Sequence, residues 1–284
     1  MTVCNKPITV NASEGVVIFD GIDFTGEALI TLNGAKEVYF KNCRFYKLTP
    51  NTKKTMAITS KASIELKLVV EKCFFGENPS IDTNAVYHIL EGNFKAANGS
   101  SFSENYFVKG CNTHNAINFY DVVDGATIGV NKNVFEYSGS AVRLGIKGAA
   151  KATFLMNGNT YLATDTSSGG EWAGFLTVQP YGKVTTSWND VTIKISNTEN
   201  KSGYKQLVVF FANDSDTHYD RTKNFPKLYI DGVLQGPDDV TFVGNTVLED
   251  VASEETTTET TTTTDTATVA DNTATETVST EATE

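Results

Sequence analysis

The chain has 284 residues and a formal net charge of −11 at pH 7, with 23 Lys and Arg against 34 Asp and Glu. An acidic chain without a basic stripe does not favour binding to nucleic acid or to an anionic membrane surface, since both attract clusters of Lys and Arg. No stretch approaches the roughly 18 apolar residues of a membrane span, and the first ten residues do not resemble a signal peptide.

Residues 1–18 are expected to form a first, capping coil, because the end of a stack of strands exposes unpaired edges. A short pattern then recurs, in which an apolar residue is followed three positions later by Asn, Cys or Ile and five positions later by an aromatic residue or Val. Its copies cover residues 19–24, 40–45, 70–75, 102–107, 130–135, 156–161, a weaker 186–191, and 242–247. The step is about 30 residues, as in solenoid repeats, and the last step is about twice as long.

A second line of strands lies between these corners, and most of its members begin with Ala. They cover residues 28–32, 57–59, 85–89, 116–120, 141–144, 173–178 and, as a seventh member, 207–211. Short strands separated by Gly, Asn and Asp turns, with no helical pattern between them, predict an all-β fold. Its coils should stack strand on strand at a spacing of about 4.8 Å.

Like residues should then form ladders inside the stack. Asn105, Asn133 and Asn159 occupy the same slot, and we expect them to take the left-handed backbone of a sharp corner while their amides bond one another. Cys43 and Cys73 hold this slot in two earlier coils. A disulfide between them is conceivable, but buried corner positions need no crosslink, so the sequence favours stacked free thiols. We interpret all five residues as structural.

Three polar segments are expected to leave the stack, at residues 163–171, 197–205 and 213–223, and each is either a solvated turn or a binding loop. The stacked domain is predicted to cover residues 1–250. Residues 251–284 contain 15 Thr, eight acidic residues and no Lys or Arg, a composition that predicts a disordered acidic tail. Without this tail the formal charge of the chain is about −3.

The segments VYFKNCRF, LVVEKCFF, VNKNVFEY and VTFVGNTV resemble those of right-handed parallel β-helix proteins, a group that includes pectate-lyase-like enzymes and phage tailspikes. The resemblance covers roughly residues 8–248. It implies a right-handed parallel β-helix solenoid of about eight or nine coils, followed by the C-terminal tail. Such motifs are specific to the fold and do not indicate one activity.

Strand alternation on the second line predicts an outward column formed by Tyr87, Asn118, Arg143 and Phe175. Tyr120 is expected beside this column, and Lys147 brings a second cation to it. Aromatic faces stack on sugar rings while amide and guanidinium groups bond sugar hydroxyls, so a glycan is one expected ligand. The same exposed stripe could instead be buried against a neighbouring subunit. The sequence leaves both alternatives open.

No catalytic constellation is identified in the sequence. Asp121 and Asp124 flank a turn, and His114 has no evident carboxylate pair to orient it. Neither a cofactor nor a metal site is predicted.

The leading hypothesis is a non-enzymatic phage virion structural protein, such as a fibre, spike or capsid-decorating protein. Its expected partners are host-surface glycan, other virion proteins or further copies of itself, with a homotrimer as one form of self-association. It would be assembled in a host cytoplasm and located in the virion, and an extracellular or cell-surface location is the alternative. The rival hypotheses are a secreted polysaccharide lyase or hydrolase and a glycan-binding module of a bacterial surface protein.

Overall fold

The computed structural model describes residues 2–13, 15–49, 57–60, 64–76, 95–108, 115–119, 121–136, 139–145, 151–163, 170–179, 188–212 and 224–244. The chain divides into two compact units, Met1–Glu249 and Asp250–Glu284. All described residues belong to the first unit. The tail predicted for residues 251–284 lies outside the described residues, so its disorder stays a prediction.

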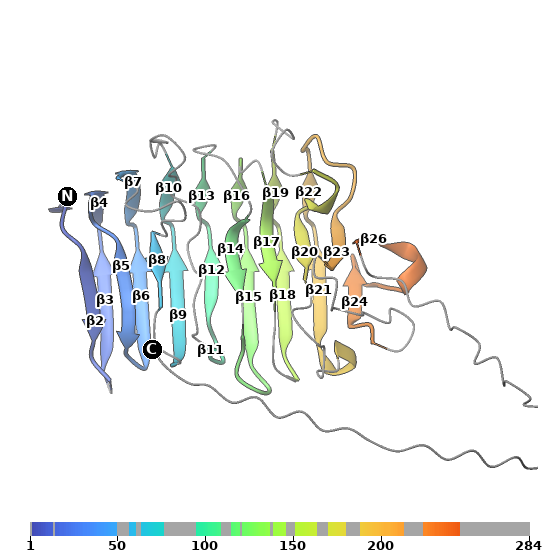
Figure 1. Ribbon diagram of the computed structural model, residues 1–284, viewed down its shortest axis with the longest axis horizontal. Coiled ribbons are helices and arrows are strands. Elements are labelled where there is room, and N and C mark those ends of the chain that lie inside the picture. Colours follow the sequence, from blue (N-terminus) through green and yellow to red (C-terminus); the bar gives the residue numbers. More distant parts are fainter. Residues whose placement is uncertain are drawn as a thin grey trace, which may run out of the picture. The chain divides into compact units, whose positions relative to one another are not determined.

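The secondary structure of the described residues is almost entirely β, in four sheets (Figure 1). The ten-stranded sheet, called the long sheet, contains β3 (Val16–Asp20), β6 (Glu37–Lys41), β9 (Glu65–Glu71), β11 (Lys95–Ala96), β12 (Ser101–Ser103), β15 (Thr127–Asn131), β18 (Thr153–Asn157), β21 (Thr192–Ser196), β24 (Lys227–Ile230) and β25 (Val233–Gln235). The eight-stranded sheet, called the corner sheet, contains β1 (Thr2–Cys4), β4 (Ile22–Gly26), β7 (Arg44–Leu48), β10 (Phe74–Gly76), β13 (Tyr106–Phe107), β16 (Val134–Phe135), β19 (Thr160–Tyr161) and β22 (Glu199–Asn200).

Two smaller sheets and three short 3-10 helices complete the described structure. The three-stranded sheet contains β2 (Ile8–Asn11), β5 (Ile30–Gly34) and β8 (Ile58–Thr59). The five-stranded sheet contains β14 (Asn115–Phe119), β17 (Ser140–Leu144), β20 (Leu176–Val178), β23 (Val208–Ala212) and β26 (Thr241–Gly244). The 3-10 helices are η1 (Gly170–Trp172), η2 (Trp188–Asp190) and η3 (Pro237–Asp239). The second line of predicted strands is confirmed in these sheets, except for residues 85–89, which lie outside the described residues.

The chain visits the long sheet, the corner sheet and one of the smaller sheets in turn, and strands pair with their counterparts in the next repeat. β15, β16 and β17, for example, pair in parallel with β18, β19 and β20. Among the described strands the one antiparallel pair is β24 with β25. In Figure 1 the strands lie side by side in chain order. Stacked parallel sheets of this kind are compatible with the predicted β-helix.

The core contains a column of aromatic rings, one from each successive strand of the corner sheet. The rings belong to Phe24, Phe45, Phe75, Phe107 and Phe135, and all five are buried. Their centroids are separated in turn by 4.6, 4.7, 5.0 and 4.8 Å, with nearly parallel planes. The spacing follows the distance between hydrogen-bonded strands, because each ring sits directly above its counterpart. The aromatic position of the sequence repeat is therefore a core position.

The predicted amide ladder is confirmed. Asn105 Nδ2 donates to Asn133 Oδ1 at 2.9 Å, and Asn133 Nδ2 donates to Asn159 Oδ1 at 3.0 Å. All three side chains are buried. Each Nδ2 group also donates to a backbone carbonyl, at Val70 for Asn105 and at Phe102 for Asn133. The ladder thus satisfies backbone groups that would otherwise be left without partners at the corner.

The left-handed backbone lies one position before the ladder residue at each of these corners. At the corners between the long sheet and the corner sheet, several non-glycine residues adopt the left-handed conformation, with φ between 50° and 56°. They are Asn42, Lys72, Glu104, Lys132 and Asn197. Glycine takes the same place at Gly158, with φ of 67°. The prediction of left-handed backbone for the three ladder Asn residues was therefore wrong. One left-handed residue makes the bend, and the Asn after it directs its amide into the stack.

Cys43 and Cys73 are free thiols, as the sequence favoured. Cys43 N donates to Cys73 Sγ at 3.4 Å, and Cys73 N donates to Asn105 Oδ1 at 2.9 Å, so sulfur continues the ladder that the amides begin. The hydrogen bond with Cys43 and burial both raise the pKa of the Cys73 thiol. Cys73 is accordingly a structural residue held in its neutral form.

Two of the expected corners differ from the structure. Within residues 186–191 the described part forms η2, and the corner of that coil comes later, between β21 and β22, at Asn197. Thr198 follows Asn197 in the ladder slot, so a pattern based on Asn, Cys or Ile missed this corner. Residues 197–205, expected to leave the stack, therefore begin inside it. Phe242 lies in β26, in register with Phe210 of the five-stranded sheet, and not at a corner.

Candidate functional site

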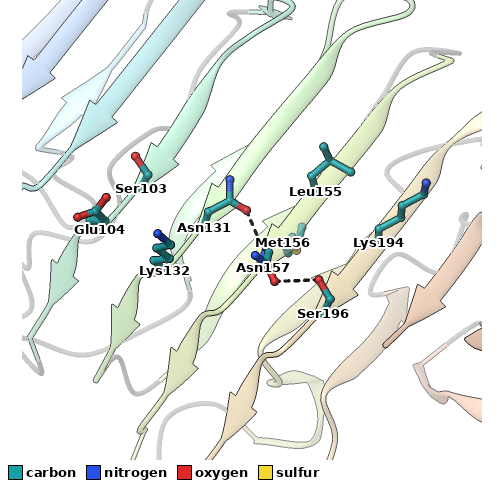
Figure 2. Close-up of a pocket in the computed structure, with 9 residues that line it drawn as sticks. All are labelled: Ser103, Glu104, Asn131, Lys132, Leu155, Met156, Asn157, Lys194 and Ser196. Carbon is teal, nitrogen blue, oxygen red and sulfur yellow. Dashed lines mark hydrogen bonds between the residues drawn. The ribbon is translucent and has the colours of Figure 1, made fainter. Parts of the chain in front are cut away.

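A groove lies on the outer face of the long sheet, where β12, β15, β18 and β21 approach the corner (Figure 2). Its volume is about 570 Å³. It is lined by Ser103, Glu104, Asn131, Lys132, Leu155, Met156, Asn157, Lys194 and Ser196. Alternate residues of the same strands, such as Phe102 and Val130, are buried in the core, so the polar residues between them face outward.

Polar side chains form a row along this groove because the four strands are parallel and in register. From one strand to the next, the residues in register are Ser103, Asn131, Asn157 and Ser196. Neighbouring strands lie about 4.8 Å apart, so each coil contributes one polar group to the row at a regular spacing. We call these four residues, two Asn amides flanked by two Ser hydroxyls, the amide row.

Hydrogen bonds fix the direction of the two amides in the row. Asn157 N donates to Asn131 Oδ1 at 3.1 Å. The Oδ1 atom of Asn157 accepts hydrogen bonds from Ser196 Oγ at 3.0 Å and from Asn197 Nδ2 at 2.9 Å. Figure 2 shows the contacts of Asn157 with Asn131 and Ser196. Because both carbonyl oxygens are bonded, the Nδ2 groups are the remaining polar groups of these side chains, and they are oriented before any ligand binds.

Charged side chains flank the amide row. Lys132 and Lys194 supply two ammonium groups, and Glu104 is the one carboxylate among the lining residues. Leu155, in register with Lys194 and 37% exposed, adds an apolar surface. Most of the polar groups that line this groove can donate hydrogen bonds, and the aliphatic parts of the lining add apolar surface, so the groove suits a ligand that is rich in hydroxyl or carboxylate oxygens and also has an apolar face.

Two residues of the predicted outward column are in fact buried. Asn118 and Phe175 are both 0% exposed, so the expectation that they lie exposed on the outer surface was wrong. Phe175 precedes β20, and its ring centroid lies 6.1 Å from that of Phe135 and 6.4 Å from that of Tyr161. Phe175 is therefore part of the aromatic core. Neither residue is available on the surface to bind a ligand.

Arg143 is partly exposed. Its partners in register are Asn118 and Thr177, so the structure brings Asn118 and Arg143 together, as predicted. Phe175 is not in register with them. Every residue of β14 is buried. Alternation assigns one solvated face to a strand, and the assignment fails where both faces of a sheet are covered. Tyr87, Tyr120 and Lys147 lie outside the described residues, so their proposed binding roles stay predictions.

The groove residues were missed by the sequence reasoning, although a signal for two of them was present. Asn131 and Asn157 each stand two positions before a ladder residue, in the repeated pattern Asn-x-Asn. The second Asn of each pair is buried and the first is outward, since one left-handed residue separates them. Reading both Asn positions of the repeat would have predicted an outward row beside the inner ladder.

A second outward row lies on the corner sheet, where neighbouring side chains cover one another. The Arg44 guanidinium lies 4.3 Å from the ring centroid of Tyr46 and 5.7 Å from that of Phe74. The ring of Phe74 is parallel to that of Tyr106, with 6.4 Å between centroids. The Tyr106 hydroxyl donates to the Glu136 carboxylate, which raises the pKa of Tyr106. These cation–π and ring contacts stabilise the sheet surface.

Comparison of the chain with protein-family models, with curated proteins and with solved structures found no match. Among the described residues, no group of three or more His, Cys, Asp or Glu side chains is placed to hold a metal ion. The described part of the chain also contains no helix with the length and apolar character needed to cross a membrane.

Proposed function

We propose that this chain is a right-handed parallel β-helix solenoid that serves as a non-enzymatic structural protein of a phage virion, and that its groove binds a host-surface glycan. The virion assignment rests on the resemblance of the repeats to tailspike-like proteins. The glycan assignment rests on the groove itself. A fibre, a spike and a capsid-decorating protein all need such a rigid, outward-facing surface.

The amide row is the observation that carries the glycan proposal. Glycans present hydroxyl groups at regular intervals, and the row presents Asn131 and Asn157 at the spacing of the coils. Their amides are oriented by hydrogen bonds before binding, which lowers the entropy cost of holding a ligand. Leu155 supplies an apolar surface for the carbon-bound hydrogens of a sugar ring, and Lys194 supplies a charged donor beside it.

A glycan suits this groove better than a protein partner does. The buried centre of a protein interface is enriched in aromatic residues, Met and Arg and depleted of Lys. The exposed polar groups of this groove are amides, hydroxyls, two Lys ammonium groups and the Glu104 carboxylate, with Leu155 as the exposed apolar residue. This composition resembles a polar ligand site with few directional contacts more than it resembles a protein interface.

The test compares two matched lysine substitutions on the long sheet. Lys194→Ala removes a groove ammonium, whereas Lys227→Ala removes an exposed ammonium from β24 outside the groove. Binding is first located on an array of bacterial surface polysaccharides and then measured by calorimetry. Loss of a charge-assisted hydrogen bond should weaken binding about tenfold or more in Lys194→Ala. Equal affinities for the two variants, or no binding to any glycan, would remove the glycan assignment.

The absence of catalysis is tested separately. The bound glycan is incubated with the protein, and new reducing ends and unsaturated uronate absorbance are followed. We expect neither signal, because binding at the amide row requires no proton transfer. Either signal would favour the polysaccharide lyase or hydrolase hypothesis instead. The virion assignment is tested by mass spectrometry of purified particles of a phage that encodes the chain, where the protein should be present in fixed stoichiometry.

A further inference from the structure

The most exposed large apolar side chains of the described residues lie on edge strands at the two ends of the strand stack. Large hydrophobic residues that are exposed include Val16 and Ile18 of β3, each 59% exposed, and Val233 and Leu234 of β25, at 63% and 59%. β3 and β25 are the two edge strands of the same sheet, the long sheet. Soluble proteins usually protect sheet edges with charges, proline or covering segments, so two apolar edges need an explanation.

Among the described strands, each of these residues has a neighbouring strand on one side only. Ile18 is in register with Tyr39 of β6, and Leu234 is in register with Tyr229 of β24. Both belong to a single outward ladder of residues in register that runs along the whole long sheet, from Ile18 at one edge to Leu234 at the other. Within the described part of the chain, no strand of the long sheet pairs with β3 on the side before Ile18, and none pairs with β25 on the side after Leu234.

The inner face of the sheet ends in the same way. Phe19 stacks on Phe40, with 4.9 Å between ring centroids, and is only partly buried. At the other edge Val233 continues the inner side of the sheet beyond Ile230. In the edge strand β25, the Val233 carbonyl oxygen accepts a hydrogen bond from the side chain of Gln235 at 3.0 Å.

We propose that copies of this chain associate head to tail, with β25 of one copy pairing with β3 of the next. At this joint between two copies, the outward ladder of the long sheet continues from one copy to the next, because Leu234 of one copy lies beside Ile18 of the other on the outer face. Since β25 runs antiparallel to β24, it pairs antiparallel with β3 of a copy that is stacked in the same direction. A second copy is the favoured partner because the chain itself carries both complementary edges of one sheet.

This contact is heterologous, since two different surfaces meet, and repeated head-to-tail contacts build open chains of copies. It is independent of the glycan proposal, because the groove lies on the face of the sheet and the joint lies at its edges. Asp20 of β3 and Asp231 beside β25 place like charges near the joint. Higher salt should therefore favour association by screening their repulsion.

The test uses two variants that each block one edge. Ile18→Lys places a charge on the first edge, and Leu234→Lys places one on the last edge, as natural edge strands do. Thr153→Lys, on the outer face of the interior strand β18, is the matched control. Circular dichroism and thermal melting check that all variants fold, which is expected because the two edge side chains are exposed. Sedimentation velocity over a range of concentrations and electron microscopy report the assembly.

The wild-type protein and Thr153→Lys should form a concentration-dependent series of oligomers that lengthens with salt. Each edge variant alone should be monomeric. An equimolar mixture of Ile18→Lys and Leu234→Lys should give dimers and nothing longer, because one free first edge and one free last edge remain. A monomeric wild-type protein, a closed trimer unaffected by either variant, or an edge variant that still dimerises by itself would each overturn the proposal. Association only after another protein is added would assign the edges to a foreign partner.

Discussion

The side chains of Asn105 and Asn133, 28 positions apart in the sequence, are joined by a buried hydrogen bond of 2.9 Å. Asn133 Oδ1 also accepts from the backbone N–H of Asn105 at 3.0 Å, and its Nδ2 group donates to Asn159 Oδ1 and to the Phe102 carbonyl. One amide therefore ties three successive coils together. Its removal should be more damaging than loss of an ordinary surface hydrogen bond.

Asn133→Ala is expected to lower the free energy of unfolding by about 3 kcal/mol or more, because each buried group left without a partner costs about 1–3 kcal/mol. Denaturant titration followed by circular dichroism measures the change. Asn131→Ala, two positions earlier and outward, is the control and should cost no more than about 1 kcal/mol. If the two variants were equally stable, the inner ladder would not be a source of stability.

The neighbouring residues Tyr106 and Phe107 offer a second matched pair. Phe107 is 1% exposed and stacks between Phe75 and Phe135, whereas Tyr106 is 38% exposed on the opposite face of the strand. Phe107→Ala should lower the free energy of unfolding by about 3–5 kcal/mol, since it leaves a cavity in the aromatic column. Tyr106→Ala should lower it by about 1 kcal/mol or less. Thermal and chemical unfolding measure both changes. A larger loss of stability in Tyr106→Ala than in Phe107→Ala would contradict the prediction.

The left-handed corner gives a prediction of opposite sign. Lys72 has φ of 53°, a conformation that costs an L-residue roughly 1–2 kcal/mol and costs glycine almost nothing. Lys72→Gly is therefore expected to raise the free energy of unfolding by up to about 1 kcal/mol. Lys41→Gly, the same change inside β6, should lower it by about 0.5–1 kcal/mol. A loss of stability in both variants would show that relief of backbone strain does not offset the flexibility of glycine at the corner.

A surface network on the long sheet predicts a pH effect. Lys67 Nζ lies 3.0 Å from both Glu37 Oε2 and Tyr39 Oη, and the Tyr39 hydroxyl donates to the Glu37 carboxylate. The bond from Tyr39 and the contact with Lys67 lower the pKa of Glu37 from its ordinary value of 4.5. A carboxyl group with a lowered folded-state pKa stabilises the fold above its unfolded pKa and loses that contribution as the pH falls through the folded value.

The stability difference between the wild-type protein and Glu37→Gln should therefore shrink as the pH falls from about 6 to about 3. Melting temperatures of both proteins across this range measure the difference. Glu65→Gln, on β9 of the same sheet, serves as a control for general charge effects. A difference that stayed constant or grew on acidification would contradict the role assigned to Glu37.

The repeat itself was readable from the sequence because a stacked coil places like residues at like positions. Phe45, Phe75 and Phe107 share one position of the repeat and share one core column. The spacing of Asn105, Asn133 and Asn159 likewise predicts the ladder from the sequence. The corner at Asn197 escaped because Thr198 fills the ladder slot there, and a left-handed backbone leaves little mark on composition.

The sequence by itself thus determined the all-β class, the period of the repeats and the identity of the inner ladders, since these depend on contacts between equivalent positions of successive coils. The tertiary structure alone decided which outward positions reach solvent. Alternation places Asn118 and Asn131 equally on the outer side of their strands, yet Asn118 is buried and Asn131 lines a groove. Exposure depends on what covers the outer face of each sheet, and side-chain alternation within a strand carries no information about that covering.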